Sequence, residues 1–191
     1  MDRGGMGDRR RELLAGLSGH VLEVGAGSGS NFRWYPPEVS SVVAVEPERH
    51  LRRLAHVAAT DAAADITVMA GSAERLPVGD EAFDAVVYSL VLCSVDDQAR
   101  ALAEARRVLK PGGQLRFLEH VRSLNLWLGR AQGLLDATVY PPLAGGCHMG
   151  RDTATALRQA GFDAVRVTRF RFPAGFPLPT SLHIIGSATR D

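Results

Sequence analysis

The sequence lacks an apolar run that could cross a bilayer. Its longest mostly apolar stretch, Ala85 to Val95, is well short of the roughly 20 residues that a membrane-spanning helix needs. The chain opens with MDRGGMGDRRRELL, which has no apolar centre of the kind found in signal peptides. We therefore expect a cytoplasmic location, and nothing in the sequence indicates membrane contact.

The chain also has little net charge and few cysteines. The formal net charge of the 191 residues is +1, which does not favour nucleic acid as a partner. The short basic run at residues 9–11 is interpreted as the solvated end of a helix. The two cysteines, Cys93 and Cys147, cannot make a disulfide framework, and Cys93 is expected to be a buried thiol. Cys147 stands beside His148, but no third and fourth ligand follow at suitable spacing, so no metal is expected.

What the sequence does contain is a series of short β-rich runs that alternate with stretches of helical spacing. The expected strands are His20–Gly25, Val42–Glu46, Ile66–Ala70, Asp84–Leu90 and Gln114–His120, and the expected helices between them are Glu48–Ala59 and Asp97–Leu109. This order predicts right-handed crossovers in a mostly parallel sheet that is covered on both faces. Apolar residues make up 46% of the chain and charged residues 23%, as in a globular protein of one domain.

The pattern changes after His120. Residues 123–150 contain aromatic, Pro-Pro and Gly-Gly positions with weak regularity, and we expect an insertion over the edge of the sheet where ligands bind. Its apolar side chains are expected either to line a pocket or to pack on the sheet; they are Leu124, Leu126, Trp127, Leu128, Leu134, Leu135 and Tyr140. Further on, Asp152–Gly161 predicts a helix, and Ala164–Phe170 and Ser181–Ala188 predict an antiparallel pair of strands at one edge.

The predicted fold is therefore α/β, a doubly wound, mostly parallel sheet of seven strands with an insertion after the fifth strand. We expect one domain over residues 1–191. Its parts are an N-terminal helix (1–19), a ligand-binding core (20–120), an insertion on the substrate side (123–150), and a C-terminal helix and strand pair (151–191).

A glycine-rich turn follows the first expected strand. In VLEVGAGSGS, residues 21–30, the glycines are Gly25, Gly27 and Gly29. Ligands of doubly wound sheets bind at the carboxyl ends of the strands, and glycines there let the backbone come close to them. Glu46 ends the second strand, 21 positions after Gly25, where an acidic side chain can accept both hydroxyls of a ribose. The pair predicts a nucleoside ligand.

Two features distinguish among nucleoside ligands. A dinucleotide fingerprint needs glycine or alanine where this chain has Ser30, which counts against an NAD-dependent oxidoreductase. Glu23 instead gives E-x-G-x-G-x-G, which resembles the first motif of the class I S-adenosylmethionine-dependent methyltransferases. That resemblance implies a Rossmann-like sheet and S-adenosyl-L-methionine as the cofactor. The ammonium of its methionine tail favours a carboxylate such as Glu23, and its carboxylate favours backbone N–H groups.

The segment GSAERLP, residues 71–77, resembles the loop that holds adenine in these enzymes. The resemblance implies that Ser72, where many relatives have aspartate, meets the exocyclic amine and that the Ala73 N–H meets a ring nitrogen. Glu74 is an alternative partner for the amine. The other cofactor-binding positions that the resemblance implies are Pro47, Ser89 and Leu90.

Longer blocks carry a closer resemblance. The blocks EVGAGSGSNFRWYPP, SLVLCSVDDQ, RVLKPGGQLRFLEHV and GGCHMGRDT are similar to the methyltransferase-like group that includes the mammalian thiol S-methyltransferases. This implies a methyltransferase for a small apolar acceptor, with a thiol preferred. Mammalian members carry an apolar N-terminal anchor, which the mostly polar start of this chain does not resemble, so membrane association is not carried over.

Other functions stay open at this point. Related folds methylate lipid headgroups or quinones, and a non-catalytic module that binds S-adenosylmethionine is a further alternative. Nucleic-acid methylation is not expected, because no N/D-P-P-Y/F motif follows the fourth strand and no basic patch exists beyond residues 9–11. A small molecule is therefore the expected partner, and the sequence leaves the oligomeric state open.

A thiol acceptor must lose its proton, because the thiolate is the reactive species. His120 ends the fifth strand near the expected methyl group, and imidazole suits proton transfer at neutral pH; a structural histidine is the alternative. Glu119 points the other way by strand alternation. His148 is the second catalytic candidate, if the insertion brings it over the site. Arg151 and Asp152 are expected to form an ion pair or a helix cap rather than a catalytic pair.

Overall fold

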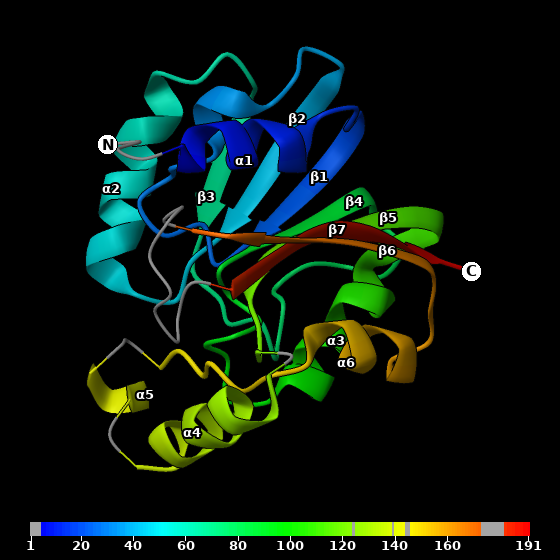
Figure 1. Cartoon of the computed structure of the whole chain (residues 1–191). Coiled ribbons are helices and arrows are strands. Elements are labelled where there is room, and N and C mark those ends of the chain that lie inside the picture. Colours follow the sequence, from blue (N-terminus) through cyan, green and yellow to red (C-terminus); the bar gives the residue numbers. More distant parts are fainter. Residues whose placement is uncertain (1–4, 124, 139, 144–145, 173–181) are drawn as a thin grey trace.

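A seven-stranded sheet forms the centre of the molecule. The computed structural model describes residues 5–123, 125–138, 140–143, 146–172 and 182–191. The strands are β1 (Gly19–Val24), β2 (Val39–Val45), β3 (Ile66–Met69), β4 (Phe83–Ser89), β5 (Leu109–His120), β6 (Phe162–Arg171) and β7 (Leu182–Arg190). They lie in the order β3-β2-β1-β4-β5-β7-β6 (Figure 1). Strands β1 to β5 pair in parallel, and β7 is antiparallel to both β5 and β6.

Helices cover both faces of this sheet. They are α1 (Met6–Leu14), α2 (Arg49–Thr60), α3 (Gln98–Val108), α4 (Leu126–Asp136), α5 (Tyr140–Leu143) and α6 (Thr153–Gln159), with a 3-10 turn at Phe32–Trp34. Helices α1 and α2 pack on one face through Leu13 and Ala55, and α3 and α6 pack on the other through Leu102 and Leu157. Helices α4 and α5 lie beyond the carboxyl ends of the strands (Figure 1). The predicted doubly wound α/β fold is confirmed.

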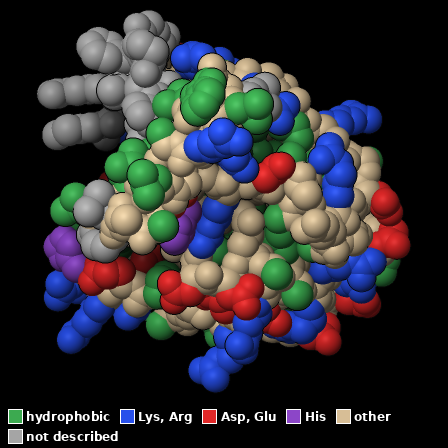
Figure 2. Space-filling view, turned by 60° about the horizontal axis from the view of Figure 1, so that its bottom comes forward, with side chains coloured by type: hydrophobic (Ala, Val, Ile, Leu, Met, Phe, Trp, Pro, Cys, Tyr) green, Lys and Arg blue, Asp and Glu red, His purple; other side chains and the backbone are tan. Residues whose placement is uncertain are grey.

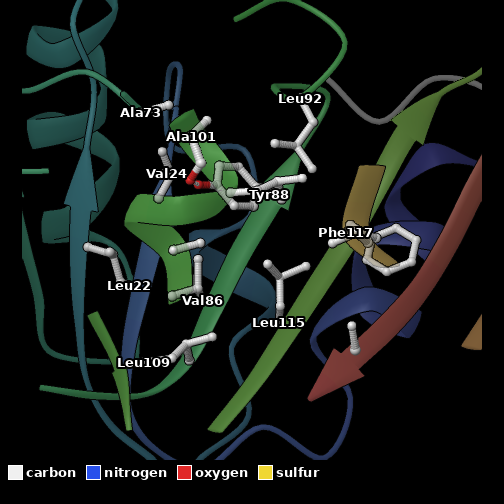
Figure 3. Close-up of a cluster of buried hydrophobic side chains, with 14 of the residues drawn as sticks. Leu22, Val24, Ala73, Val86, Tyr88, Leu92, Ala101, Leu109, Leu115 and Phe117 are labelled. Carbon is white, nitrogen blue, oxygen red and sulfur yellow. Dashed lines mark hydrogen bonds between the residues drawn. The ribbon is translucent and has the colours of Figure 1, made fainter. Parts of the chain in front are cut away.

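The central strand β4 shows why this sheet needs helices on both faces. Its consecutive residues Val86, Val87 and Tyr88 are all 0% exposed, so side chains on both faces enter the core. Figure 3 shows Tyr88 next to Ala101 of α3, whose carbonyl accepts the Tyr88 hydroxyl at 2.9 Å. A buried tyrosine hydroxyl needs such a partner.

Acidic residues begin three of the helices. Helices α2, α3 and α6 start after Glu48, Asp97 and Asp152, whose carboxylates accept N–H groups of the first turn. The expected helix cap at Asp152 is thus confirmed. Its neighbour Arg151 donates instead to two carbonyls of the segment after β4, each at 2.6 Å. These two bonds hold that segment against the start of α6.

Strand β5 begins earlier than expected. Helix α3 ends at Val108, as the Lys-Pro-Gly-Gly turn predicts, but Leu109 at once pairs with Phe83 of β4. Gly112, with a φ of 77°, falls within the resulting irregularity of the register. The local sequence pattern did not predict this start, because Leu109 pairs with Phe83, which is distant in the sequence. The final antiparallel pair is confirmed, although Ser181, its expected boundary, lies outside the described residues.

Helix α4, in the segment between β5 and α6, exposes several of its apolar side chains. Leu126, Trp127 and Leu134 are 73%, 78% and 69% exposed. The expectation that these three line a pocket or pack on the sheet is therefore wrong. Helix α4 turns a polar residue inward instead, since Gln132 is buried and accepts a backbone N–H at 2.8 Å. Leu124 lies outside the described residues. Within the described residues, no helix combines the length and apolarity that crossing a membrane requires.

Candidate active site

A cavity of about 800 Å³ lies at the carboxyl ends of β1, β2 and β4, where the strand order reverses. Figure 2 looks onto this end of the molecule and shows a hollow bordered by basic, acidic and histidine side chains. Nine of the residues expected to bind a cofactor line the cavity: Glu23, Gly25, Gly27, Glu46, Pro47, Ser72, Ala73, Ser89 and Leu90. The nine residues predicted from the sequence thus come from four separate segments and line one cavity.

Gly27 gives the cavity its open stretch of backbone. Its φ is 57°, a left-handed conformation that side chains rarely adopt, and a Cβ there would meet nothing within 4 Å. The space beside Gly27 therefore belongs to the cavity. A Cβ at Gly25 would lie 2.5 Å from Val91, and one at Gly29 would lie 2.7 Å from Phe32. Gly29 is not among the lining residues, so its absent side chain serves packing of the turn.

Glu46 fixes the glycine turn to the end of β2. Its carboxylate is nearly buried, and it accepts the Gly27 N–H at 2.8 Å and the Glu48 N–H at 2.9 Å. Each carboxylate oxygen keeps a further lone pair that a ligand hydroxyl can reach. Glu46 is thus held in one orientation before any ligand arrives.

Glu23 lies in a buried hydrogen-bond network. Its carboxylate accepts Asn31 Nδ2 at 2.8 Å and the Tyr35 hydroxyl at 2.7 Å. Burial raises the pKa of Glu23 to about 7, against the lowering effect of these two bonds and of Arg10. Arg10 donates to Asn31 Oδ1 at 2.6 Å and to Ser89 Oγ at 3.2 Å. The interpretation of Arg10 as part of a solvated helix end is therefore wrong, because it points from α1 into the cavity wall.

The loop after β3 forms another wall of the cavity. Ser72 and Ala73 both line it, and Ser72 pairs with Arg75 in an isolated bridge. Glu74 also lines the cavity, and its Oε1 accepts the Asp96 N–H at 3.1 Å. That bond ties the loop after β3 to the loop after β4.

The end of β4 is held in a strained conformation. Leu90 has a φ of 62°, which is costly for a branched side chain, and its N–H donates to the Leu118 carbonyl at 2.7 Å. The next three N–H groups, of residues 91–93, donate to the Glu119 carboxylate at 3.0, 3.0 and 3.1 Å. Glu119 is 0% exposed, and burial raises its pKa well above the usual range. His120, the next residue, contacts other groups, as strand alternation predicts.

His120 lies beside the two cysteines. Its Nδ1 is 3.4 Å from Cys147 Sγ, and its ring packs on that of His183 with centroids 4.2 Å apart. Cys93 completes the group, since the ligand-type atoms of Cys93, His120 and Cys147 all lie within 4.8 Å of one another. A hydrogen bond from the Cys93 thiol to Cys147, together with burial, raises the pKa of Cys93 to about 12. The same hydrogen bond lowers the pKa of Cys147. We call these three residues the Cys-His-Cys cluster.

The Cys-His-Cys cluster borders the cavity without lining it. Ser94 lines the cavity, and its Oγ lies 3.6 Å from Cys93 Sγ. His148 comes near through its main chain, because its N–H donates to the Cys93 carbonyl at 2.7 Å. Spacing along the chain offered no further ligand-type side chain for Cys147 and His148, whereas the structure places Cys93 and His120 beside Cys147.

Sequence reasoning missed four residues of this region: Arg10, Asn31, Tyr35 and Cys93. A signal existed for Asn31 and Tyr35, since both belong to the N-F-x-x-Y-P-P block that follows the glycine turn. Both donate to Glu23, so the block encodes its hydrogen bonds. For Arg10 and Cys93 no local pattern was available, because their partners lie far away in the chain.

Known proteins resemble this chain over most of its length. The methyltransferase domain family matches residues 22–117. The human thiol S-methyltransferase TMT1B is 34% identical over 97% of this chain and 80% of its own length. The ubiquinone/menaquinone biosynthesis C-methyltransferase UbiE of Dinoroseobacter shibae is 32% identical over 80% of this chain and 69% of its own. The crystal structure of an S-adenosylmethionine-dependent methyltransferase from Mesorhizobium loti, 22% identical, has a TM-score of 0.71 over 96% of both chains and supports the fold alone.

Proposed function

The chain belongs to the class I S-adenosylmethionine-dependent methyltransferases, and within this family we propose that it methylates the sulfur of a small apolar thiol. S-adenosylmethionine is its methyl donor. One observation carries the choice of acceptor. The Cys-His-Cys cluster borders the cavity of a chain that is 34% identical to a thiol S-methyltransferase.

We place the nucleoside half of the cofactor between β2 and β3. Glu46 would accept the ribose hydroxyls through the lone pairs that its two backbone bonds leave over, and Pro47 would cover the sugar. Ser72 and Ala73 would hold the adenine edge. Glu74 is less suited to the adenine amine, since one of its oxygens already accepts the Asp96 N–H.

We place the methionine half at the glycine turn. Its carboxylate would lie beside Gly25 and Gly27, where the backbone is open, and its ammonium would lie toward Glu23. Glu23 suits an ammonium because a buried carboxylate gains most from a positive charge nearby. The sulfonium would then lie near Ser89 and Leu90, at the end of β4.

Methyl transfer to sulfur is an in-line displacement, and alignment of the two reactants supplies much of its rate. The strained turn at Leu90, fixed through Glu119, supports such alignment because it cannot easily shift. We propose that His120 assists the ionisation of the acceptor thiol. His148 is the second residue that we propose near the acceptor, since it follows Cys147 and is bonded to Cys93.

Both cysteines are free thiols, which fits the reducing cytoplasm that we propose as the location of the reaction. The acceptor would enter past α4 and α5, which lie beyond the carboxyl ends of the strands (Figure 1).

The test is a transfer assay with labelled S-adenosylmethionine and acceptors that share one carbon skeleton. A straight-chain alkyl thiol, amine and alcohol differ in the reacting atom alone, and a quinol tests the chemistry of the UbiE relative. We expect the labelled methyl group on the thiol sulfur, with little transfer to the amine or alcohol. Transfer to the quinol in preference to the thiol would overturn the thiol assignment. Cofactor binding without transfer to any acceptor would favour a non-catalytic binding module.

A further inference from the structure

The Cys-His-Cys cluster gathers two sulfur ligands and one nitrogen ligand from three distant segments. Cys93 follows β4, His120 ends β5, and Cys147 precedes α6. The chain contains two cysteines, and both are in this cluster. Within the described residues, this is the group of His, Cys and acidic side chains whose ligand atoms approach closely enough to hold a metal ion.

The spacing of the three atoms suits a tetrahedral ion. Zinc–sulfur bonds of about 2.3 Å and zinc–nitrogen bonds of about 2.0–2.1 Å place neighbouring ligand atoms about 3.5–3.8 Å apart. The contact between Cys147 Sγ and His120 Nδ1 is 3.4 Å, and all three atoms lie within 4.8 Å. Binding therefore requires sub-ångström to about 1 Å adjustments rather than a rearrangement of the chain.

The surrounding bonds hold the ligands in place. The Cys93 N–H is fixed by Glu119, and the Cys93 carbonyl accepts the N–H of His148. The same loop is fixed further along, where Asp136 accepts the N–H groups of Met149 and Gly150. These backbone bonds keep the loops that carry Cys93 and Cys147 in place, and loss of an outer partner of a metal ligand typically lowers affinity 10- to 100-fold.

We propose that Cys93, His120 and Cys147 bind a thiophilic divalent d¹⁰ cation of the zinc class, with a fourth position open to the acceptor sulfur. Three protein ligands with an open position are typical of catalytic zinc, whereas structural sites are closed by four. Ser94 lines the cavity and its Oγ lies 3.6 Å from Cys93 Sγ, so the cluster borders the cavity in which the cofactor sulfonium is proposed. The occupant of that position rests on the proposed function; the ion site rests on the cluster itself.

The ion explains how His120 assists ionisation without accepting a proton. The acceptor R–SH binds through sulfur and releases its proton to solvent, because a coordinating thiol is deprotonated. The thiolate sulfur then forms a bond to the methyl carbon. The bond between that carbon and the sulfonium breaks, and its electron pair stays on the departing S-adenosylhomocysteine. The product thioether is neutral and a weak ligand, so it leaves the ion.

The ion site is tested with cobalt, which gives a thiolate charge-transfer absorption that zinc lacks. The whole protein is stripped with a chelator under reducing conditions and titrated with Co²⁺. We expect about one equivalent to bind with an absorption from two thiolates. Cys147→Ser and Cys93→Ser should each halve the absorption and lower Co²⁺ affinity by more than the 10- to 100-fold typical of outer partners. Circular dichroism checks that each variant is folded. If a cysteine variant does not fold, His120→Asn is tested in its place.

His148→Ala is the matched control, since it alters the same loop but leaves all three ligands. It should keep the cobalt spectrum. A wild-type protein without thiolate absorption, or a spectrum that both cysteine variants leave unchanged, overturns the ion site. The two proposals fail separately: cobalt binding without thiol methylation overturns the proposed acceptor. Unchanged alkyl-thiol turnover in the stripped protein overturns the role of the ion and leaves the acceptor standing.

Discussion

The cofactor side of the cavity and its acceptor side are both organised by a carboxylate that binds backbone N–H groups, but only one of the two carboxylates reaches the cavity. On the cofactor side, Glu46 lines the cavity and holds Gly27, in the turn after the neighbouring strand β1, and the nearby Glu48. On the acceptor side, Glu119 holds residues 91–93 from the neighbouring strand. Each carboxylate therefore links two neighbouring parallel strands, but Glu46 borders the cavity whereas Glu119 is fully buried outside its lining.

The largest expected effect comes from Glu119→Ala. The change leaves two buried N–H groups and one partly buried N–H group without an acceptor, and each buried group costs about 1–3 kcal/mol. We expect the free energy of unfolding to fall by about 3–5 kcal/mol, measured by urea denaturation. Glu46→Ala is the comparison on the cofactor side. It leaves two N–H groups at the cavity wall without an acceptor, but water can reach them there. Glu46→Ala should therefore lower the free energy of unfolding by less than Glu119→Ala does. Equal losses in the two variants would contradict the difference between the sides.

Gly27→Val tests the cofactor side through shape. The new side chain would enter the open space beside Gly27, where the methionine half of the cofactor is proposed. We expect its Kd for S-adenosylmethionine, measured by calorimetry, to rise by roughly 10- to 100-fold, which is about 1.4–2.8 kcal/mol. The matched control is Gly112→Val. Gly112 has a φ of 77° and equally open surroundings, but it lies in β5 away from the cavity. Both variants place valine at a positive φ and therefore share the backbone strain. Only Gly27→Val also enters the cavity, so Gly112→Val is expected to leave the Kd unchanged.

A smaller effect is expected from pH, through Glu23. Its pKa of about 7 is raised from its ordinary value by burial, so the carboxyl is partly protonated at pH 6–7. Ammonium binding favours the carboxylate and releases that proton, so affinity for S-adenosylmethionine should rise with pH up to about 7 and then level off. The change should not exceed about 10-fold per pH unit. Glu23→Gln removes the titrating group and should flatten this part of the profile. A wild-type profile without slope between pH 6 and 7 would place the ammonium elsewhere.

The same pKa affects the stability of the ligand-free protein with a defined sign. The folded-state pKa of Glu23 lies above its unfolded value, so the folded protein binds more protons between pH 4.5 and 7. The contribution of Glu23 to stability therefore falls as pH rises through this window. Bound cofactor should reduce that fall, since it supplies the positive charge that the buried carboxylate lacks.

The two sides also differ in what the sequence could predict. Glu46 and Gly27 were found because a glycine turn after one strand and an acidic residue about 20 positions later form a recognisable spacing. The strands were found because apolar runs between glycine and proline mark them, although the start of β5 depends on the distant Phe83 and was missed. Within the Cys-His-Cys cluster, His120 was predicted as a catalytic residue because it lies at the end of a strand. Cys93 was recognised as buried but not as its neighbour, since that contact exists only across β4 and β5.

Helix α4 shows a different limit. Its leucines and Trp127 suggested a pocket lining, because apolar side chains are most often buried. The structure exposes Trp127 and buries Gln132, whose amide has a backbone partner. Composition alone could not reveal which face of the helix turns inward, because that choice depends on contacts outside the helix, such as the hydrogen bond from the Ser123 N–H to Gln132.

The most direct test of the account is the turnover of His120→Ala on an alkyl thiol and on an acidic aryl thiol at pH 7. We predict that alkyl-thiol turnover falls by roughly 10²- to 10⁴-fold, the usual worth of assistance to proton removal, while cofactor affinity stays near wild type. Aryl-thiol turnover should fall much less, because that thiol is already ionised in solution. His56→Ala, on the exposed surface of α2, is the control and should change neither rate. Full alkyl-thiol turnover by His120→Ala would contradict the account, and His120 would then have a purely structural role.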